Sequence, residues 1–280
     1  IPILTRKLSG AEYGLLGYLT AFSQTLSTLV TLGLVSNIAP LFYKYHARSQ
    51  VKRLVGTVVG FQFLYGLLWA IALSLAASKI VSQLGLDQSV VSNAILMIWI
   101  TFASGFAFLP TLILNIIERP VGYIKYCVVA MVCSFVFPVL LMGWFQHGVF
   151  GVQLGILVAA IVAFLAGLFM IRNYFTVCMD REVIRDVLLF AAPAFPHLFL
   201  WTMFRYVDRI FVGSASGMGA VGVYSLAASL SSILLIVQSG GLSALNPLFF
   251  RTILADPTAL KIQWRRVTAY YGYASIWMGL

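Results

Sequence analysis

The sequence predicts an all-α, polytopic transmembrane helical bundle, and three observations support this fold class. Of the 280 residues, 61% are hydrophobic and only 9% are charged, whereas soluble domains have about 45–50% apolar and about 25% charged residues. The mean hydropathy is +0.97. Apolar runs of about 20 residues recur, and each could cross a hydrocarbon core of about 30 Å as a helix. A soluble domain is excluded, and the continuous runs do not alternate as barrel strands would.

Seven complete spans and two partial ones are expected along the chain. The complete spans are residues 13–36, 54–77, 91–114, 123–145, 150–171, 188–212 and 220–246. Residues 1–4 resemble the end of an earlier span, and residues 267–280 resemble the first half of a later one. We therefore expect the sequence to be a fragment of a longer polytopic protein.

The Lys and Arg residues predict the orientation of the spans. The loops around 40–53, 115–125, 172–187 and 247–266 hold thirteen of the eighteen basic residues, whereas the alternate loops hold only Arg6, Lys7 and Lys79. Because positive loops remain inside, the first set is expected to be cytoplasmic. Lys and Arg are not interleaved with aromatic residues in polar runs, so nucleic acid is not an expected partner.

Two local patterns predict helix starts and a domain boundary. Ser9 and Glu12 form an S-x-x-E capping box before the first complete span. Residues 180–187 alternate charge signs and carry apolar residues on one side, which is typical of an interfacial amphipathic helix. We expect an N-terminal lobe over residues 1–175, a cytoplasmic linker over 176–187 and the start of a C-terminal lobe over 188–280.

A weak internal repeat supports two lobes. GLVSNIAPLFYK at residues 33–44 and GGLSALNPLFFR at 240–251 share Gly, Ser, Pro, Leu and Phe at an offset of 207 residues. The alternative interpretation is that the shared residues only reflect a common way of ending a span at the cytoplasmic interface. Six spans separate the two copies, so both have the same orientation, and two parallel lobes related by an axis along the membrane normal are predicted.

Charged residues inside a predicted span are the first candidate site. Arg205, Asp208 and Arg209 are spaced i, i+3 and i+4, so they share one helix face. An intramembrane Arg is costly and normally faces a partner, a cavity or the interface. Asp208 can neutralise one Arg, which leaves one positive charge. The cluster is either an anion contact or a salt bridge at the outer membrane surface.

Two buried amides are the second candidate site. Gln24 belongs to a polar stripe in the first complete span, and Gln238 accompanies a series of serines in the last one. Small hydroxyl residues at such spacing also pack helices closely. An amide in lipid needs partners, so Gln24 and Gln238 either bond across helices or line a wet cavity. The stripe in the first span consists of Thr20, Gln24, Ser27, Thr28 and Thr31.

The outer loop LTRKLSGAEYGLLGY, the cytoplasmic PLFYK, and the later RYVDRIFVG and GAVGVYSLA are similar to segments of a known transporter family. The sequence resembles the polysaccharide (O-antigen type) flippases of the multidrug/oligosaccharidyl-lipid/polysaccharide exporter superfamily. The resemblance implies about twelve or more spans in two six-helix lobes. It also implies an undecaprenyl-pyrophosphate oligosaccharide as substrate, and it maps the family's Asp-Arg pair onto Asp208 and Arg209.

The expected function is export of this lipid-linked anionic saccharide across the cell inner membrane by alternating access, in surface polysaccharide biosynthesis. We expect no enzymatic activity, no cofactor and no metal; the lipid bilayer and other polysaccharide assembly proteins are the expected partners. One alternative is a multidrug or cation antiporter, which would place a carboxylate in the cavity, where only Asp208 is available. The other is a membrane-embedded glycosyltransferase or polymerase, but the outer loops offer only Glu12 and Asp87 as acids.

Overall fold

The structure is a computed structural model that describes residues 6–32, 41–42, 45, 50–117, 119–145, 148–176, 178–255 and 272; the side chains at 116, 144–145 and 233–255 are outside this description. The chain divides into two compact units, residues 1–223 and 224–280. The first unit contains the helices as far as residue 223 of the last one, and the second contains the rest of that helix.

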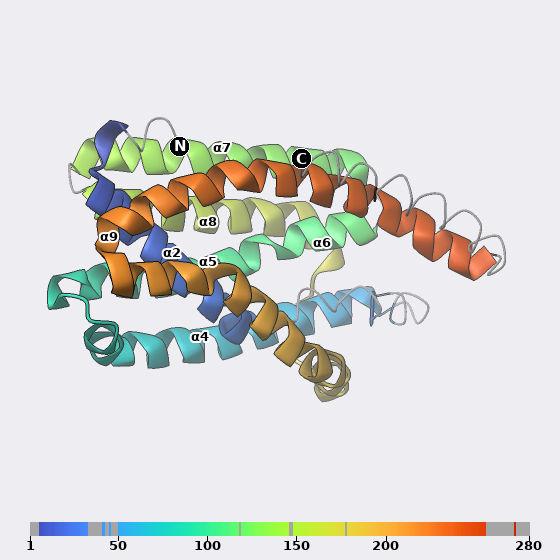
Figure 1. Ribbon diagram of the computed structural model, residues 1–280. Coiled ribbons are helices and arrows are strands. Elements are labelled where there is room, and N and C mark those ends of the chain that lie inside the picture. The colour runs from blue at the N-terminus through green and yellow to red at the C-terminus, as the bar shows by residue number, and fades with distance from the viewer. Residues whose placement is uncertain are drawn as a thin grey trace. The chain divides into compact units, whose positions relative to one another are not determined.

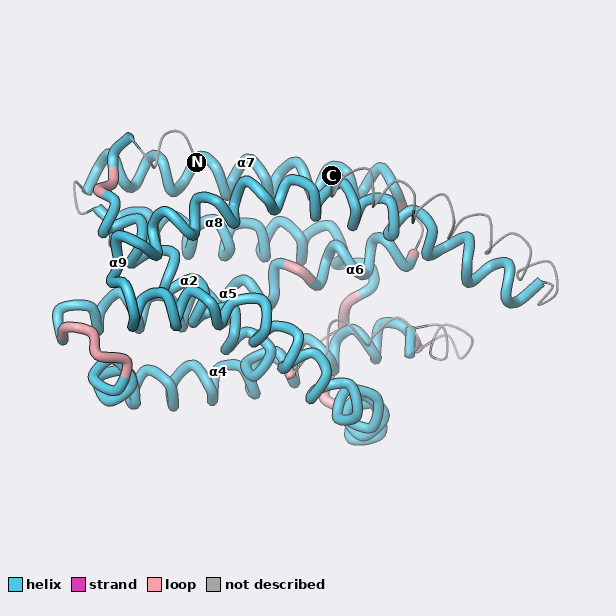
Figure 2. The backbone as a smooth tube through the Cα atoms, viewed as in Figure 1, coloured by secondary structure: helices cyan, strands magenta, loops and turns pink. Residues whose placement is uncertain are grey.

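The described residues form helices and two short 3-10 turns, without strands (Figures 1 and 2). In chain order, the elements are α2 (Gly10–Thr31), α4 (Val51–Gln83), η2 (Gln88–Val90), α5 (Val91–Ala107), α6 (Leu109–Ile116), α7 (Pro120–Phe145), α8 (Gly148–Ile171), η3 (Arg172–Tyr174) and α9 (Arg181–Ala255). The predicted all-α bundle of long apolar helices is confirmed.

Five stretches within the described residues are long and apolar enough to cross a membrane. They are Val51–Gln83, Gln88–Asn115, Pro120–Gly143, Gly148–Tyr174 and Arg181–Ser232. The predicted first complete span, which corresponds to α2, is not among them because it carries the polar stripe. The last stretch includes the predicted spans at 188–212 and the start of 220–246, and α9 is interrupted between them at Gly217, with φ 79° and ψ 173°. The predicted total of seven spans and the two lobes stay predictions.

The predicted capping box at the start of α2 is confirmed. The Glu12 backbone N–H donates to Ser9 Oγ over 3.2 Å, and the Ser9 backbone N–H donates to Glu12 Oε2 over 2.8 Å. These bonds satisfy two helix-end donors that would otherwise be exposed or unpaired. The cap fixes where α2 begins, and hence the register of its polar stripe.

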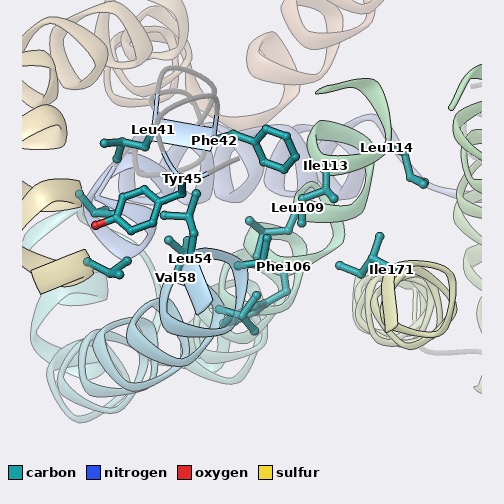
Figure 3. Packing of buried hydrophobic residues seen from close by; sticks show 14 of the residues in the cluster. Leu41, Phe42, Tyr45, Leu54, Val58, Phe106, Leu109, Ile113, Leu114 and Ile171 are labelled. Atoms are coloured by element: carbon teal, nitrogen blue, oxygen red, sulfur yellow. The ribbon is translucent and has the colours of Figure 1, made fainter. Parts of the chain in front are cut away.

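Two apolar clusters stabilise opposite ends of the first unit. One joins Leu8, Leu16 and Leu19 of the α2 region to Met97 and Ile100 of α5, together with residues of α4 and α8. The second cluster is drawn in Figure 3 and is built mainly from residues of α4, α6 and the start of α9, with Tyr45 and Ile171. Tyr45 also donates its hydroxyl to Asp186 Oδ2 over 3.0 Å. Polar residues of α2 and α5 lie between these clusters.

Connections that the predicted topology places on the same side of the membrane lie at the same end of the bundle. At one end, the start of α8 lies against the start of α2, because a Cβ on Gly148 would be 2.6 Å from Glu12 Oε1. At the other end, Arg53 forms a salt bridge with Asp180, which joins the start of α4 to the connection between α8 and α9. We call this second end the basic end. Its assignment to the cytoplasm stays a prediction.

Small residues allow α8 to pack closely. Gly151, Gly155, Ala159, Ala163 and Gly167 recur every four residues, and all are buried. A Cβ on Gly155 would collide with the backbone of Pro138 in α7, and one on Gly151 would be 3.1 Å from the Leu141 carbonyl oxygen. Such a stripe of small residues lets membrane helices approach each other closely. By contrast, α7 turns apolar side chains outward, including Ile124, Met131 and Phe135 at 59–66% exposure, as a lipid-facing helix does.

The charged segment before the sixth predicted span is the first part of α9. Asp180 caps the helix, because its Oδ1 accepts from the backbone N–H groups of Glu182 at 2.8 Å and Val183 at 3.4 Å. Val183 and Val187 are buried, and Glu182 and Arg185 are exposed. The amphipathic pattern is therefore present, although the segment continues into α9 without a break. Its role as a linker between lobes stays a prediction.

Candidate functional site: a polar cleft among three helices

A polar cleft of about 360 Å³ lies among α2, α5 and α9. Eight of its twelve lining residues carry a hydroxyl or an amide, which is unusual inside a set of apolar helices. Its lining residues are Ser23, Gln24, Ser27, Thr28, Thr31, Ile100, Thr101, Ser104, Gly105, Phe108, Leu198 and Thr202. We refer to this set as the cleft.

The cleft lies at the middle of the spans that form it. Thr101 is at the centre of the Gln88–Asn115 stretch, and Thr202 is two residues past the centre of the predicted span 188–212. On α2 and α5 the cleft residues also separate the two apolar clusters. Polar groups at mid-membrane depth are tolerated where they face protein or a water-filled cavity. Transporters commonly bind their substrates at this depth.

Hydrogen bonds between helices frame the cleft. Ser23 and Thr101 hydroxyls bond to each other across α2 and α5, and Thr101 also donates to the Met97 carbonyl over 2.8 Å. Thr28 and Thr202 join α2 to α9 over 3.0 Å. Such bonds hold membrane helices in register, because an unpaired hydroxyl in lipid is unfavourable.

The environment of Gln24 favours the interpretation that its polar stripe lines a cavity. Its side chain lines the cleft, is exposed, and has no hydrogen-bond partner among the described residues. The neighbouring hydroxyls of Ser27 and Thr31 donate to carbonyls of their own helix, over 2.6 and 2.8 Å. These hydroxyl oxygens can still accept hydrogen bonds, while the Gln24 amide can donate and accept. The lining therefore offers both kinds of partner to a sugar hydroxyl.

A buried amide on α4 lies behind one wall of the cleft. Gln62 is 2% exposed, and its Nε2 donates to the Gly105 carbonyl over 3.2 Å. Its Oε1 has no partner among the described residues. Gly105 is required here, because a Cβ would be 2.8 Å from Thr31 Cγ2 and 3.3 Å from Gln62 Nε2. Because Gly105 has no side chain, only its backbone lies between the cleft and the Gln62 amide.

The register of α9 against α2 places the predicted arginine cluster. Thr202 pairs with Thr28, and Gly213 lies against the Tyr18 ring, at 2.7 Å for an added Cβ. Ten residues of α2, from 28 back to 18, thus match eleven residues of α9, from 202 to 213. The two segments run antiparallel, so the stretch containing Arg205 and Arg209 lies alongside residues 21–25 of α2.

Arg205 and Arg209 continue the face of α9 that lines the cleft. The spacing from Leu198 to Thr202, Arg205 and Arg209 is four, three and four residues, which is one helix face. Arg205 is exposed and Arg209 is half-buried. Each guanidinium lies near the Tyr206 ring, with Cζ 5.9 Å and 5.3 Å from the centroid. At 1.5 Å per residue, Arg205 is only about 5 Å along the axis from Thr202.

The remaining predicted site residues are placed less fully. Asp208 is half-buried on the same turn of α9 as the arginines. Gln238 lies in the α9 helix of the second unit, but its side chain is outside the described residues. In that unit Ser229 and Ser232 donate to carbonyls of their own helix, and the packing role expected for those serines stays a prediction. Among the described residues no group of three or more His, Cys, Asp or Glu could hold a metal ion.

Sequence reasoning missed the α5 wall and the α9 contact. Thr101, Ser104 and Thr202 line the cleft but were not predicted as site residues. Thr101 and Ser104 are three residues apart in a strongly apolar run, so the same stripe argument that identified Gln24 would have found them. Gln62, an amide in the middle of the next span, had a comparable signal.

Comparison with known proteins agrees with this geometry. A family model described as polysaccharide biosynthesis protein matches residues 1–253. The chain belongs to the polysaccharide biosynthesis protein family. No curated protein and no solved structure matches the chain. Membership of this family, together with the five span-length apolar helices, identifies a membrane protein of polysaccharide biosynthesis and confirms the resemblance drawn from the sequence.

Proposed function

We propose that this member of the polysaccharide biosynthesis protein family is a flippase. It moves an undecaprenyl-pyrophosphate oligosaccharide from the inner to the outer leaflet of the cell inner membrane. The observation that carries the proposal is the mid-membrane cleft, whose polar wall continues along α9 into two arginines. Transport by alternating access requires no chemistry on the substrate, so the protein acts without catalytic residues or a cofactor.

The chemistry of the substrate accounts for both parts of the site. Sugar hydroxyls are donors and acceptors, and the cleft presents hydroxyl oxygens and the Gln24 amide to them. A pyrophosphate needs cations, and Arg205 and Arg209 offer planar guanidinium groups that can make paired hydrogen bonds to its oxygens. The isoprenoid chain remains in lipid against the apolar outer faces of the helices. The cleft volume suits a portion of an oligosaccharide rather than the whole chain.

The position of the cleft supports transport by alternating access. A cavity at mid-membrane depth reaches each side in turn if the helix groups on its two sides rock against each other. The α2–α9 contact is the boundary that must open, and at the cleft its hydrogen bond joins two hydroxyls rather than an ion pair. Hydroxyl bonds between membrane helices are weak, about 0.6 kcal/mol on average. This hydrogen bond therefore adds little to the cost of separating α2 from α9 at the cleft.

Two other functions are less well supported. A drug or cation antiporter would be expected to place a carboxylate in the cavity, and the described lining of the cleft contains none. A glycosyltransferase or polymerase would need acids or metal ligands near a polar surface. The polar side chains that line the cleft are one amide and seven hydroxyls, which bind sugars but are poor general acids.

The test compares cells with and without the full-length protein. Without it, lipid-linked saccharide with complete repeat units should accumulate in the inner leaflet, and surface polysaccharide should fall. A polymerase defect would instead leave single repeat units on the outer face. An antiporter defect would change drug or cation tolerance and leave the saccharide distribution intact. Either of these two results would replace the flippase proposal.

A cleft-filling variant links this result to the cleft. Ser27→Trp projects a large side chain into the cleft and should abolish export. Val132→Trp places the same side chain on the outward face of α7, where the native residue is 48% exposed, and should leave export unchanged. Both variants must reach the membrane at normal abundance. Normal export by Ser27→Trp at that abundance would exclude the cleft as the transport path.

A further inference from the structure

A second cavity, separate from the cleft, lies at the basic end. Its volume is about 690 Å³, and it is bounded by the start of α4, the end of α6 and the connection from η3 to α9. We call it the basic pocket. These three segments are far apart in the sequence, but their contacts join them into one wall. Arg53 pairs with Asp180, and the Cys178 thiol donates to the Arg53 carbonyl over 3.4 Å.

The backbone of the connection is seated tightly on α4. A Cβ on Gly56 would collide with the Thr176 carbonyl, and one on Gly60 would be 3.1 Å from Met179 Sδ. Thr57 and Cys178 add a contact of 3.5 Å between hydroxyl oxygen and sulfur. The basic pocket is therefore preformed by packed backbone.

Positive charge is in excess around the basic pocket. Lys52 and Arg53 line it directly. Arg119 is exposed beside it, with Cζ 5.6 Å from the ring centroid of Tyr174, which is a lining residue. Among the described lining residues Asp180 is the one acid; it is paired with Arg53 and also caps α9. Lys52 is exposed and has no ion-pair partner among the described residues.

The rest of the lining is apolar. Phe42, Val51 and Ile117 form part of the wall beside Lys52. Because Val51 begins one span-length helix and Ile117 lies two residues past the end of another, the basic pocket lies where the hydrocarbon core meets the headgroups. A ligand that satisfies such a site carries a negative charge at one end and apolar chain at the other. Basic pockets between membrane helices bind anionic lipid headgroups in this way.

We propose that the basic pocket binds the phosphodiester headgroup of an anionic membrane phospholipid, with Lys52 and Arg119 as the contacting cations and the apolar wall beside the first acyl carbons. The proposal is independent of the transported substrate, because it concerns a different cavity and needs only the bilayer. Bound lipid would join α4 to the connection that leads into α9.

Binding can be measured on the full-length protein in a zwitterionic detergent. Phosphatidylglycerol and phosphatidylcholine with the same acyl chains are added in turn, and bound lipid is counted by native mass spectrometry. Phosphatidylglycerol should bind more tightly. Lys52→Gln should weaken phosphatidylglycerol binding about fivefold, since each basic residue near an anionic lipid contributes on the order of 1 kcal/mol. Arg119→Gln should give a similar loss.

A matched control is available on the same helix. Lys79 is also exposed on α4, but it is near the opposite end, beyond the basic pocket. Lys79→Gln removes the same charge and should leave phosphatidylglycerol binding unchanged. An equal loss in Lys52→Gln and Lys79→Gln would show general attraction to positive charge and would overturn the proposal.

Inorganic phosphate separates the two sources of phosphate chemistry. At millimolar concentration it should not displace phosphatidylglycerol, because it lacks the acyl chains that contact the apolar wall. If phosphate displaced the lipid fully, the basic pocket would be a site for a soluble phosphate, and the lipid proposal would fail. Unchanged thermal unfolding of Lys52→Gln without lipid shows that its fold is intact. If Lys52→Gln does unfold, phosphatidylglycerol binding by Arg119→Gln tests the proposal instead.

Discussion

Thr28 of α2 and Thr202 of α9 share a hydrogen bond across the cleft, with their hydroxyl oxygens 3.0 Å apart. Thr202 also donates to the Leu198 carbonyl over 2.8 Å. A hydroxyl has one hydrogen to donate, so Thr28 is the donor in the bond between the helices. This bond sets the register that brings Arg205 alongside the polar stripe of α2.

The Thr28–Thr202 bond should appear as a coupling free energy. Thr28→Val and Thr202→Val remove it singly and together, and the double-mutant cycle should give a coupling of about 0.6–1.7 kcal/mol, as for other hydrogen bonds between membrane helices. Unfolding in mixed micelles measures it. Thr25 provides the control, because its hydroxyl donates to the Ala21 carbonyl of its own helix. A cycle of Thr25→Val with Thr202→Val should be additive within about 0.5 kcal/mol; equal coupling in both cycles would contradict the assignment.

Gly14 should be intolerant of a side chain. A Cβ there would collide with the Met218 carbonyl oxygen and lie 3.0 Å from the Gly222 backbone nitrogen. Because backbone cannot move aside as a flexible side chain can, Gly14→Ala should destabilise the protein by about 1–3 kcal/mol. Gly219, close to the same crossing, has nothing within 4 Å of an added Cβ. Gly219→Ala should be neutral or slightly stabilising in the same unfolding assay. Equal stability of the two variants would refute close packing at this crossing.

The stability lost in a Gly105 variant should be restored by a second substitution at Thr31. Gly105→Ala should destabilise the protein by about 1 kcal/mol, because crowding against Thr31 Cγ2 outweighs the helix preference of alanine. Thr31→Ser removes that methyl and keeps the hydroxyl, which donates to the Ser27 carbonyl. The double variant should therefore recover most of the lost stability, whereas Thr31→Ser alone should change little. Without this recovery, the steric account of Gly105 would be wrong.

The sequence predicts the helices well because they depend on local patterns. The capping box at Ser9 and Glu12 requires residues three apart, and long apolar runs require only composition. The break near Gly217 also falls within a predicted connection. Each of these features is decided within one or two turns of a single helix, so no knowledge of packing is needed.

The candidate site is predicted only in part, because it depends on which helices meet. The stripe containing Gln24 could be recognised, but nothing local shows that Thr202 of α9 would face it, 174 residues away in sequence. The closeness of Gln62 to Gly105 likewise depends on packing between α4 and α5. The basic pocket arises from three separate segments, and its geometry is absent from each of them.

The ends of α4 test the predicted sidedness of the membrane. In a variant whose Cys127, Cys133 and Cys178 are replaced by Ser, single cysteines are introduced as Lys52→Cys or Lys79→Cys. Both native residues are exposed. In intact cells a membrane-impermeant thiol reagent should label position 79 and reach position 52 only after permeabilisation, because positive loops remain inside. The reverse pattern would invert the topology and place the basic pocket outside.

Arg205 tests whether the charged face of α9 contacts an anion. Losing a hydrogen bond to a charged group costs about 1.5–3 kcal/mol, so Arg205→Ala should reduce export of surface polysaccharide roughly ten- to a hundredfold. Arg205→Lys keeps the charge but loses the planar guanidinium, and should restore export only partly if the ligand is a pyrophosphate. Arg185, an exposed residue near the start of the same helix, is the matched control, and Arg185→Ala should export at the parental rate.

These results also separate substrate contact from a structural ion pair. Arg205 and Asp208 are three residues apart on one face, so removing the arginine could destabilise the helix bundle. Membrane abundance and thermal unfolding of each variant distinguish that effect from lost transport. Full rescue by Lys would indicate a nonspecific positive charge at the membrane surface. Normal abundance and parental export in Arg205→Ala would exclude Arg205 as a substrate contact, and the cleft residues of α2 and α5 would then carry recognition without it.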